Sequence, residues 1–406
     1  MKWLLVSENF PPKTGGSSRW FWGIYRRLPR ADFVVAAGED PRQEAFDRTH
    51  DLPVERLPLM LRTWALASFG GLAGYGRAVW RLRRMVREHE VGMVHCGRCL
   101  PEGVIALALK AWTGIPYLCY AHGEEVNRAP ARGGGGLLDS RELRWLTGRV
   151  LRGAALVLAN SRNTERILRT EWRLPAERVR VLHPGVDTRR FTPAPRQPAV
   201  RARLGWGDRP VILTVGRLQK RKGHDQLVRA LAAIRRSIPS VLYAIVGDGE
   251  ERGFLEQLVA REGAGDHVRF LGAVADDTLI ACYQQCDLFI LPNRQVGDDI
   301  EGFGMVLLEA QACGKPVVAG ASGGTAETLR VPETGRLVCC DGPDELAAVA
   351  VDLLADPARL GRMGQSARRW VVERFDWTAL SRQAEALFRA ALPPRAFAPA
   401  VEPVHL

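Results

Sequence analysis

Residues 211–223 have the sequence VILTVGRLQKRKG, an apolar pentapeptide followed directly by a basic loop that lies between two glycines. So short an apolar run predicts a strand buried on both faces, as in a parallel sheet. Open parallel sheets bind ligands at the carboxyl ends of their strands, which is where Arg217 and Lys222 fall. Arginine binds phosphate through two parallel hydrogen bonds and lysine offers a compact charge, so the loop predicts an anion site. A solvated basic loop is the alternative.

The same pattern of strand and helix extends over the whole chain. Further strands are predicted at residues 2–6, 33–37, 92–95, 117–121, 156–159, 179–182, 241–246, 268–271, 288–291, 316–319 and 335–338. Helical segments lie between them, for example at residues 141–151, 226–237, 253–262 and 343–354. This alternation predicts an α/β fold of two Rossmann-like, doubly wound parallel-sheet domains that face each other across a cleft.

A proline- and arginine-rich stretch at residues 191–198 separates the two halves. We therefore predict a first domain at residues 1–190 and a second at 191–375. The last helical segment has no further strand to cover, so residues 376–392 are predicted to cross back to the first domain. A disordered tail is predicted at 393–406, and a mobile loop near the cleft at the four glycines 133–136.

The composition indicates a protein without membrane spans or a disulfide framework. No apolar run approaches the roughly 20 residues that cross a bilayer, and the opening Met1–Val6 is too short for a signal peptide. We therefore predict a cytoplasmic location. Among the eight cysteines, Cys96 and Cys99 have the spacing of half a zinc site, but no second pair follows. Reduced thiols and no metal site are predicted.

The net charge of +12 is confined to the first half. Residues 1–190 hold 31 Lys and Arg against 19 Asp and Glu, whereas residues 191–406 hold 26 of each. This asymmetry predicts that the first half meets an anionic surface, either a membrane or a nucleic acid. Basic and aromatic residues interleave in one stretch: Trp64, Phe69, Arg77, Trp80, Arg81, Arg83, Arg84 and Arg87. Trp20, Trp22, Arg26, Arg27 and Arg30 would extend this patch. A solvated arginine-rich face is the alternative.

Residues 301–310, EGFGMVLLEA, carry two carboxylates with seven residues between them. Gly302 and Gly304 predict the start of a helix whose free amides bind an anion such as a diphosphate. Glu309 is the sole charge of an apolar helix, which costs several kcal/mol unless the carboxylate binds something. We predict that Glu309 binds a ribose and that Glu301 hydrogen-bonds sugar hydroxyls. A structural salt bridge for Glu309 is the alternative.

Two features of the first half also lie at predicted strand ends. Gly15 and Gly16 follow the first strand, where backbone amides can approach a phosphate or sugar closely; a tight turn is the alternative. They do not form GxGxxG, so the dinucleotide-binding pattern is absent. His122 ends the strand at 117–121 and precedes a glycine, which favours a functional role over a structural one.

These motifs together resemble the retaining GT-B glycosyltransferases of family 4, the glycosyl transferases group 1. The matching pieces follow the family's order over nearly the whole chain. They are FPPxxGG at 10–16, His122-Gly123, Asn160-Ser161, HPGVD at 183–187, GRLxxRKG at 216–223, Gly247-Asp248-Gly249, residues 268–272, the two-glutamate motif and residues 316–319. Within the family, residues 300–306 and 319–324 are most similar to GDP-mannose-dependent phosphatidylinositol mannosyltransferases.

The resemblance implies catalytic roles for four residues. Arg217 and Lys222 would neutralise the donor diphosphate and stabilise the departing nucleoside diphosphate. Glu301 would hold the donor sugar, and His122 would orient it near its reacting carbon. The implied donor-binding set adds a phosphate contact at Gly16, the base at Leu271, backbone amides at Gly302, Phe303 and Gly304, and the ribose at Glu309.

The implied reaction moves a hexose, mannose from GDP-mannose first of all, to a lipid-linked or glycan acceptor, with retention and without metal or other cofactor. UDP-glucose or UDP-N-acetylglucosamine is the alternative donor. An anionic membrane surface is a further expected partner, with peripheral association at the inner face of the membrane, and no nucleic acid is expected. Two other classes stay open: a sugar-nucleotide epimerase of the same fold, and a nucleic-acid-binding protein that uses the basic first half.

Overall fold

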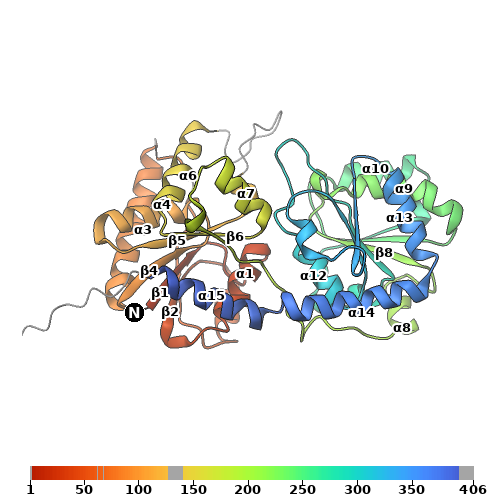
Figure 1. Ribbon diagram of the computed structural model, residues 1–406, viewed down its shortest axis with the longest axis horizontal. Helices are drawn as coiled ribbons and strands as arrows, with labels where there is room; N and C mark the ends of the chain where they lie inside the picture. Colours follow the sequence, from red (N-terminus) through yellow and green to blue (C-terminus); the bar gives the residue numbers. More distant parts are fainter. Residues whose placement is uncertain (1, 62, 67, 127–139, 393–406) are drawn as a thin grey trace, which may run out of the picture.

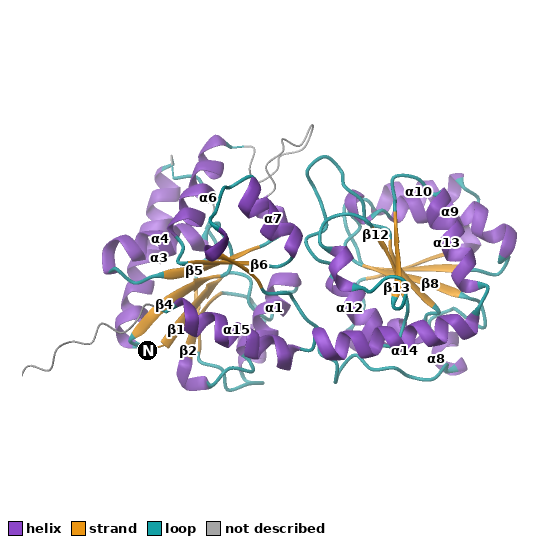
Figure 2. Cartoon of the chain, viewed as in Figure 1, coloured by secondary structure: helices purple, strands orange, loops and turns teal. Residues whose placement is uncertain are grey.

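The computed structural model describes residues 2–61, 63–66, 68–126 and 140–392. Two α/β units lie side by side, each with a central sheet covered by helices on both faces (Figures 1 and 2). This is the predicted fold class. The glycine run at 133–136 and the tail at 393–406 lie outside the described residues.

The first sheet has seven parallel strands in the order β3-β2-β1-β4-β5-β6-β7. The strands are β1 (Lys2–Ser7), β2 (Phe33–Gly38), β3 (Val54–Leu57), β4 (Val91–Cys96), β5 (Tyr117–Ala121), β6 (Leu156–Ala159) and β7 (Val179–Val181). The strand order reverses between β1 and β4, and ligands of such sheets bind at the carboxyl ends of the strands beside this switch point.

The second sheet has six parallel strands in the order β10-β9-β8-β11-β12-β13. The strands are β8 (Val211–Val215), β9 (Leu242–Val246), β10 (Val268–Gly272), β11 (Leu288–Leu291), β12 (Val317–Gly320) and β13 (Gly335–Val338). Its switch point lies between β8 and β11. The basic loop after β8 and the two-glutamate motif after β11 therefore begin on either side of that point.

Helices connect the strands and cover the sheets. In the first unit they are α1 (Gly16–Tyr25), α2 (Gln43–Asp47), α3 (Phe69–Glu88), α4 (Glu102–Thr113), α5 (Gly123–Val126), α6 (Arg141–Gly153) and α7 (Arg162–Thr170). They continue as α8 (Pro198–Arg203), α9 (His224–Ser237), α10 (Arg252–Arg261), α11 (Asp276–Gln285), α12 (Met305–Ala312), α13 (Asp344–Leu354), α14 (Pro357–Arg374) and α15 (Trp377–Ala391). Two short 3₁₀ helices matter for the site: η3 (Lys220–Lys222) lies in the basic loop, and η5 (Thr325–Thr328) contacts the first unit through Glu327.

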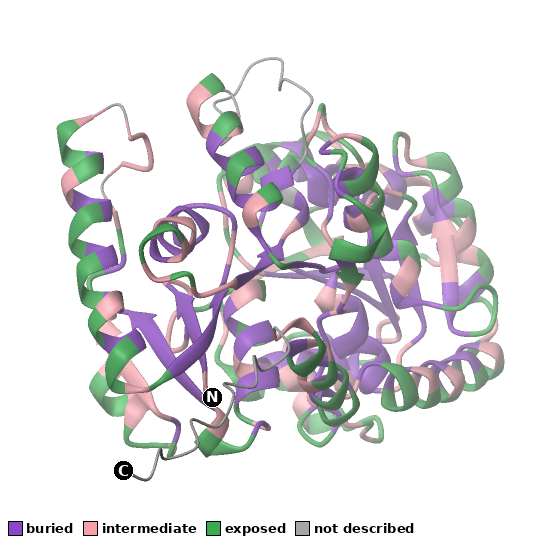
Figure 3. Ribbon diagram, turned by 60° about the vertical axis from the view of Figure 1, so that its left-hand side comes forward, coloured by how far each residue is buried: buried purple, intermediate pink, exposed green. Residues whose placement is uncertain are grey.

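The inner strands are buried on both faces because they are continuously apolar, as in β2, β5, β9 and β11, whereas the edge strands β3 and β10 are mostly half-buried (Figure 3). In β1, Leu4 and Val6 enter one core cluster while Trp3 and Leu5 enter the other, as the two-residue period of a strand requires. All eight cysteines lie in described residues, and none of them forms a disulfide in the structure.

The last helix, α15, packs on the first unit rather than the second (Figure 1). Trp377 covers Gly23 of α1 so closely that a Cβ on Gly23 would lie 2.3 Å from the indole ring. Phe388 is fully buried against Trp3, with ring centroids 5.4 Å apart. A chain crossing at Phe375-Asp376 thus links α14 of the second unit to α1 of the first.

Candidate functional site

The loops at the carboxyl ends of the two sheets meet at a pair of glycines. A Cβ on Gly123 would lie 3.0 Å from Cα of Gly302, and one on Gly302 would lie 3.0 Å from Nδ2 of Asn160. A side chain at either position would therefore force its neighbours aside. His122 and Glu301 immediately precede these glycines, so the contact brings two of the predicted catalytic residues to one interface.

Glu301 lies in a buried cluster with two cations of the basic loop. Lys222 Nζ is 2.5 Å from Glu301 Oε2, and Arg221 Nη1 is 3.0 Å from the same oxygen. Arg221 also pairs with Asp299 through Nε at 2.9 Å. Burial raises the pKa of Glu301, but the Lys222 and Arg221 charges outweigh it and hold the pKa below its ordinary value. The carboxylate is therefore ionised, and it positions the Lys222 ammonium at the carboxyl end of β8.

Arg217 differs from Lys222 in being exposed. It follows Gly216 at the end of β8, and its side chain has no hydrogen-bond or ion-pair partner among the described residues. An exposed guanidinium next to a buried, already neutralised ammonium is available to bind an incoming anion.

Glu309 has two protein partners, whereas the sequence argument treated it as an unpaired carboxylate that needs a ligand. Its Oε1 is 2.5 Å from Arg19 Nη1, and its Oε2 accepts a hydrogen bond from the Tyr283 hydroxyl at 2.6 Å. Arg19 belongs to α1 of the first unit, so this ion pair joins the units. The side chain of Glu309 is 3% exposed and that of Arg19 is 47% exposed. Arg19 can therefore leave without passing through the core, which would free Oε1 for a ligand.

His122 is held through both ring nitrogens. Nε2 lies 2.9 Å from the carbonyl of Gly97, which only accepts, so Nε2 carries the hydrogen. Nδ1 is then the acceptor for the Ser17 hydroxyl at 3.3 Å. Trp20 and Phe21 pack edge-on against the ring. The imidazole is thus oriented with Nε2–H toward Gly97, beside the loop of Gly123.

The starts of two helices lie close together at the same interface. Gly304, at φ +90°, precedes α12, and a Cβ on Gly16, the first residue of α1, would lie 3.8 Å from Sδ of Met305. Helix N-termini present free amides and partial positive charge, so both favour an anion. The Phe303 side chain is 3% exposed in the second core, which leaves only its backbone for a ligand. Leu271 is the penultimate residue of the edge strand β10, two strands from β8.

Sequence reasoning missed the residues that act between the units. Arg19 and Glu327 carry no local pattern, because their partners are distant in sequence and only the fold unites them. Tyr283, which bonds Glu309 within the second unit, was missed as well. Asn160 and His183 were visible only as parts of family motifs.

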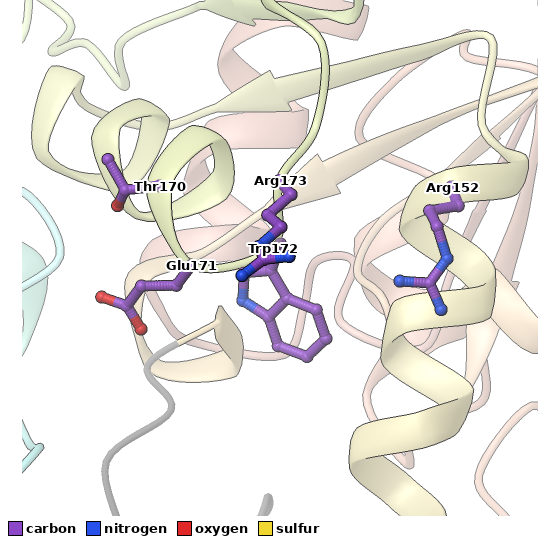
Figure 4. A pocket seen from close by; sticks show the side chains of 5 residues that line it. All are labelled: Arg152, Thr170, Glu171, Trp172 and Arg173. Carbon is purple, nitrogen blue, oxygen red and sulfur yellow. The ribbon is translucent and has the colours of Figure 1, made fainter.

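The pocket drawn in Figure 4 belongs to the first unit alone and contains none of the predicted site residues; Arg152, Thr170, Glu171, Trp172 and Arg173 line it. In the described part of the chain, no group of three or more His, Cys, Asp or Glu could hold a metal ion.

Helix α3 carries the patch predicted to meet an anionic surface. Phe69, Leu72 and Trp80 are 89%, 57% and 63% exposed. The predicted extension of this patch through α1 is wrong at Trp20, which is buried in the core at 1% exposure. Arg27 is only partly exposed and pairs with Asp187 at 3.5 Å, so its charge is not free for a lipid surface. Over the residues described, no helix is long and apolar enough to span a bilayer.

Comparison with known proteins identifies the family. The model of Glycosyltransferase Family 4 matches residues 14–190, and that of Glycosyl transferases group 1 matches residues 197–370. A GDP-mannose-dependent alpha-(1-6)-phosphatidylinositol monomannoside mannosyltransferase of Mycolicibacterium smegmatis is 34% identical over 394 residues, 95% of this chain and 97% of that protein. The chain belongs to the glycosyl transferases group 1.

Other members of the group agree in sequence and fold. A D-inositol 3-phosphate glycosyltransferase of Salinispora arenicola is 32% identical, over 89% of this chain and 84% of that protein. The structure of a sucrose-phosphate synthase from Thermosynechococcus elongatus superposes with a TM-score of 0.78 at 25% identity, over 96% of this chain and 99% of that one. The fold is therefore the GT-B fold of these glycosyltransferases, and the chain is a hexosyltransferase.

Proposed function

We propose that the chain transfers mannose from GDP-mannose to a phosphatidylinositol mannoside or a closely related lipid-linked acceptor, with retention at the anomeric carbon. The observation that carries the proposal is the near-full-length similarity to a mannosyltransferase with this donor and acceptor class. The arrangement of charges at the unit interface supports it.

In this proposal the donor diphosphate binds between the basic loop and the start of α12. Exposed Arg217 grips the diphosphate, and Lys222, held by Glu301, adds a fixed charge beside it. Amides at Gly302–Gly304 and at Gly16 contribute partial positive charge from the two helix starts. These groups stabilise the negative charge that develops on the leaving nucleoside diphosphate.

Three groups hold the rest of the donor. Glu309 binds the ribose after Arg19 has moved away, and Glu301 offers its remaining acceptor capacity to sugar hydroxyls. His122 orients the sugar, with its tautomer set by Gly97 and Ser17. Contact of the two units around the donor excludes water, which favours transfer over hydrolysis.

We also propose that the reaction needs no divalent metal, because Arg217, Lys222 and the helix starts supply the positive charge that a metal ion supplies in other transferases. Turnover in excess EDTA equal to that in magnesium supports this. A loss of turnover that magnesium or manganese restores contradicts it.

The donor and acceptor are tested with a matched panel. GDP-mannose, UDP-glucose and UDP-N-acetylglucosamine are each offered with phosphatidylinositol monomannoside in detergent or with D-inositol 3-phosphate. We expect a product only from GDP-mannose and the lipid, with an α-linkage by NMR. A product formed only from a UDP-sugar would favour the alternative donor, and a product formed only with inositol phosphate would favour the acceptor named for the Salinispora relative.

The lipid acceptor gives the exposed face of α3 a role. Its apolar residues Phe69, Leu72 and Trp80 lie on the solvent side together with the exposed Arg77 and Arg81. We propose that this face rests on an anionic leaflet, where apolar side chains enter the interface and arginines meet lipid headgroups.

A further inference from the structure

Glu327 belongs to the second unit, but its carboxylate bonds only to the first unit and to the segment that leaves it. Its Oε2 accepts the backbone N–H of Arg162 at 2.8 Å, and its Oε1 accepts that of Asn163 at 3.2 Å. His183 Nε2 donates to Oε2 at 2.8 Å. A carboxylate of one unit therefore caps a helix of the other.

The helix that it caps, α7, leaves these amides without intrahelical partners. Ser161 Oγ accepts only the third amide, that of Thr164, so Glu327 satisfies the two that precede it. Burial raises the pKa of Glu327, but the hydrogen bonds from His183 and from the two amides outweigh it. The net pKa lies below its ordinary value, so the group is ionised. Charge-assisted bonds at a helix N-terminus are among the stronger polar contacts that a protein makes.

The segment that contains Glu327, from Gly324 through η5, also holds the loop of residues 301–304. Gly324, just before η5, donates its N–H to the carbonyl of Glu301 at 3.0 Å. A Cβ on Gly324 would lie 2.3 Å from the carbonyl oxygen of Gly302 and 2.8 Å from Cβ of Ser161. The ring of His183 stacks on Phe303, with centroids 5.2 Å apart and planes 24° apart. Glu327 thus lies at a junction of α7, His183 and the loop that contains Glu301.

We infer that Glu327 is a positioning residue for sugar transfer: by tying η5 to the start of α7, it holds the units so that the Glu301–Gly304 loop meets His122-Gly123. The inference rests on the proposed function, in which the donor reacts at that meeting point. Because none of the carboxylate's hydrogen bonds lies within the second sheet or its helices, its removal costs the second unit nothing. The first unit loses only a helix cap, a small part of its stability, so we expect the interface to open while both units stay folded.

The backbone N–H of Arg162, which bonds Glu327, can be removed on its own and so tests this role selectively. Arg162 is the first residue of α7, where proline is well tolerated, so Arg162→Pro deletes the N–H that bonds Glu327 and keeps the helix. Arg162→Ala is the matched control, since it keeps the N–H and removes only an exposed side chain. We expect Arg162→Pro to lower kcat with GDP-mannose about tenfold, the worth of one hydrogen bond to a charged group, and Arg162→Ala to leave kcat unchanged.

The reciprocal variant is Glu327→Ala, with Glu333→Ala as its control; Glu333 is a half-exposed glutamate of the same segment, 3.8 Å from Arg330. We expect Glu327→Ala to lower kcat at least tenfold and to change the Kd for GDP less than about threefold, because the proposed GDP ligands lie mostly in the second unit. Small-angle scattering without ligand should give Glu327→Ala a larger radius of gyration than the wild type and both controls.

Two results would overturn the inference: wild-type kcat in both Arg162→Pro and Glu327→Ala, or a parallel loss of kcat and GDP affinity with an unchanged radius of gyration. Failure of the proposed function is seen separately, because wild-type protein would then transfer nothing from GDP-mannose. The scattering comparison needs no donor and would still decide whether Glu327 holds the units together.

Discussion

Lys222 supplies a buried positive charge from the second unit to the proposed diphosphate site. Removing it leaves Glu301 paired with Arg221, so the fold should persist while the diphosphate loses a fixed cation. We predict that Lys222→Ala weakens GDP binding by about 10- to 100-fold, the range for a lost charge-assisted hydrogen bond. Isothermal calorimetry measures this, with the exposed Lys220→Ala of the same loop as the control. Equal affinity in the two variants would place the diphosphate elsewhere.

Glu125 gives a prediction for pH. Burial raises its pKa from 4.5 to about 8, against the lowering effect of Arg98, while its carboxyl accepts the N–H of Cys99. Between these pH values the folded chain keeps a proton that the unfolded chain has released, so stability falls as pH rises through this window, by up to about 1.4 kcal/mol per unit. Glu8 and Glu102 also face this network.

Glu125→Gln keeps an acceptor for the Cys99 amide and removes the titration. We expect its melting temperature to exceed that of the wild type at pH 8 and to approach it at pH 5. The exposed Glu177→Gln should follow the wild type at both pH values. A constant difference between Glu125→Gln and wild type across this range would show that Glu125 is ionised throughout.

At the scale of elements, strands were predictable and long-range partners were not. The strand Tyr117–Ala121 was predicted with its observed bounds because a buried parallel strand is apolar at every position. Edge strand β3 was missed because its sequence VERL holds two charges in four half-buried residues. The strand ends also located Arg217, Lys222 and His122. Arg19 could not be inferred, because its partner lies 290 residues away and nothing local marks an interface arginine.

The contact between α15 and α1 depends on one glycine. A Cβ at Gly23 would lie 2.3 Å from Trp377, so we predict that Gly23→Ala destabilises the protein by about 1–3 kcal/mol through overpacking. Gly76 in α3 is the matched control, since a Cβ there meets nothing within 4 Å. Gly76→Ala should stabilise the chain by about 0.5–1 kcal/mol, because alanine is the better helix former. Denaturant unfolding measures both, and destabilisation by both would reject the packing argument.

The molecule as a whole is electrically uneven, since the excess of +12 is carried by residues 1–190. Part of that excess gathers on α3, whose exposed face also holds large apolar side chains. Only the first unit therefore combines net positive charge with apolar residues free to enter a lipid interface. A uniformly charged protein would bind an anionic vesicle in many orientations, whereas under the proposed membrane binding this distribution would turn the face of α3 toward the lipid.

This selection predicts vesicle binding that depends on both lipid charge and salt. Cosedimentation with vesicles of phosphatidylcholine and 30% phosphatidylinositol should exceed cosedimentation with pure phosphatidylcholine and should fall as salt rises. Each arginine at such an anionic surface contributes about 1 kcal/mol to binding. Arg77→Gln with Arg81→Gln should weaken binding to the anionic vesicles by about 30-fold. Arg236→Gln with Arg362→Gln removes the same charge from exposed positions of the second unit and should change binding little. Equal weakening by the two pairs would mean that net charge, not the face of α3, draws the chain to the lipid.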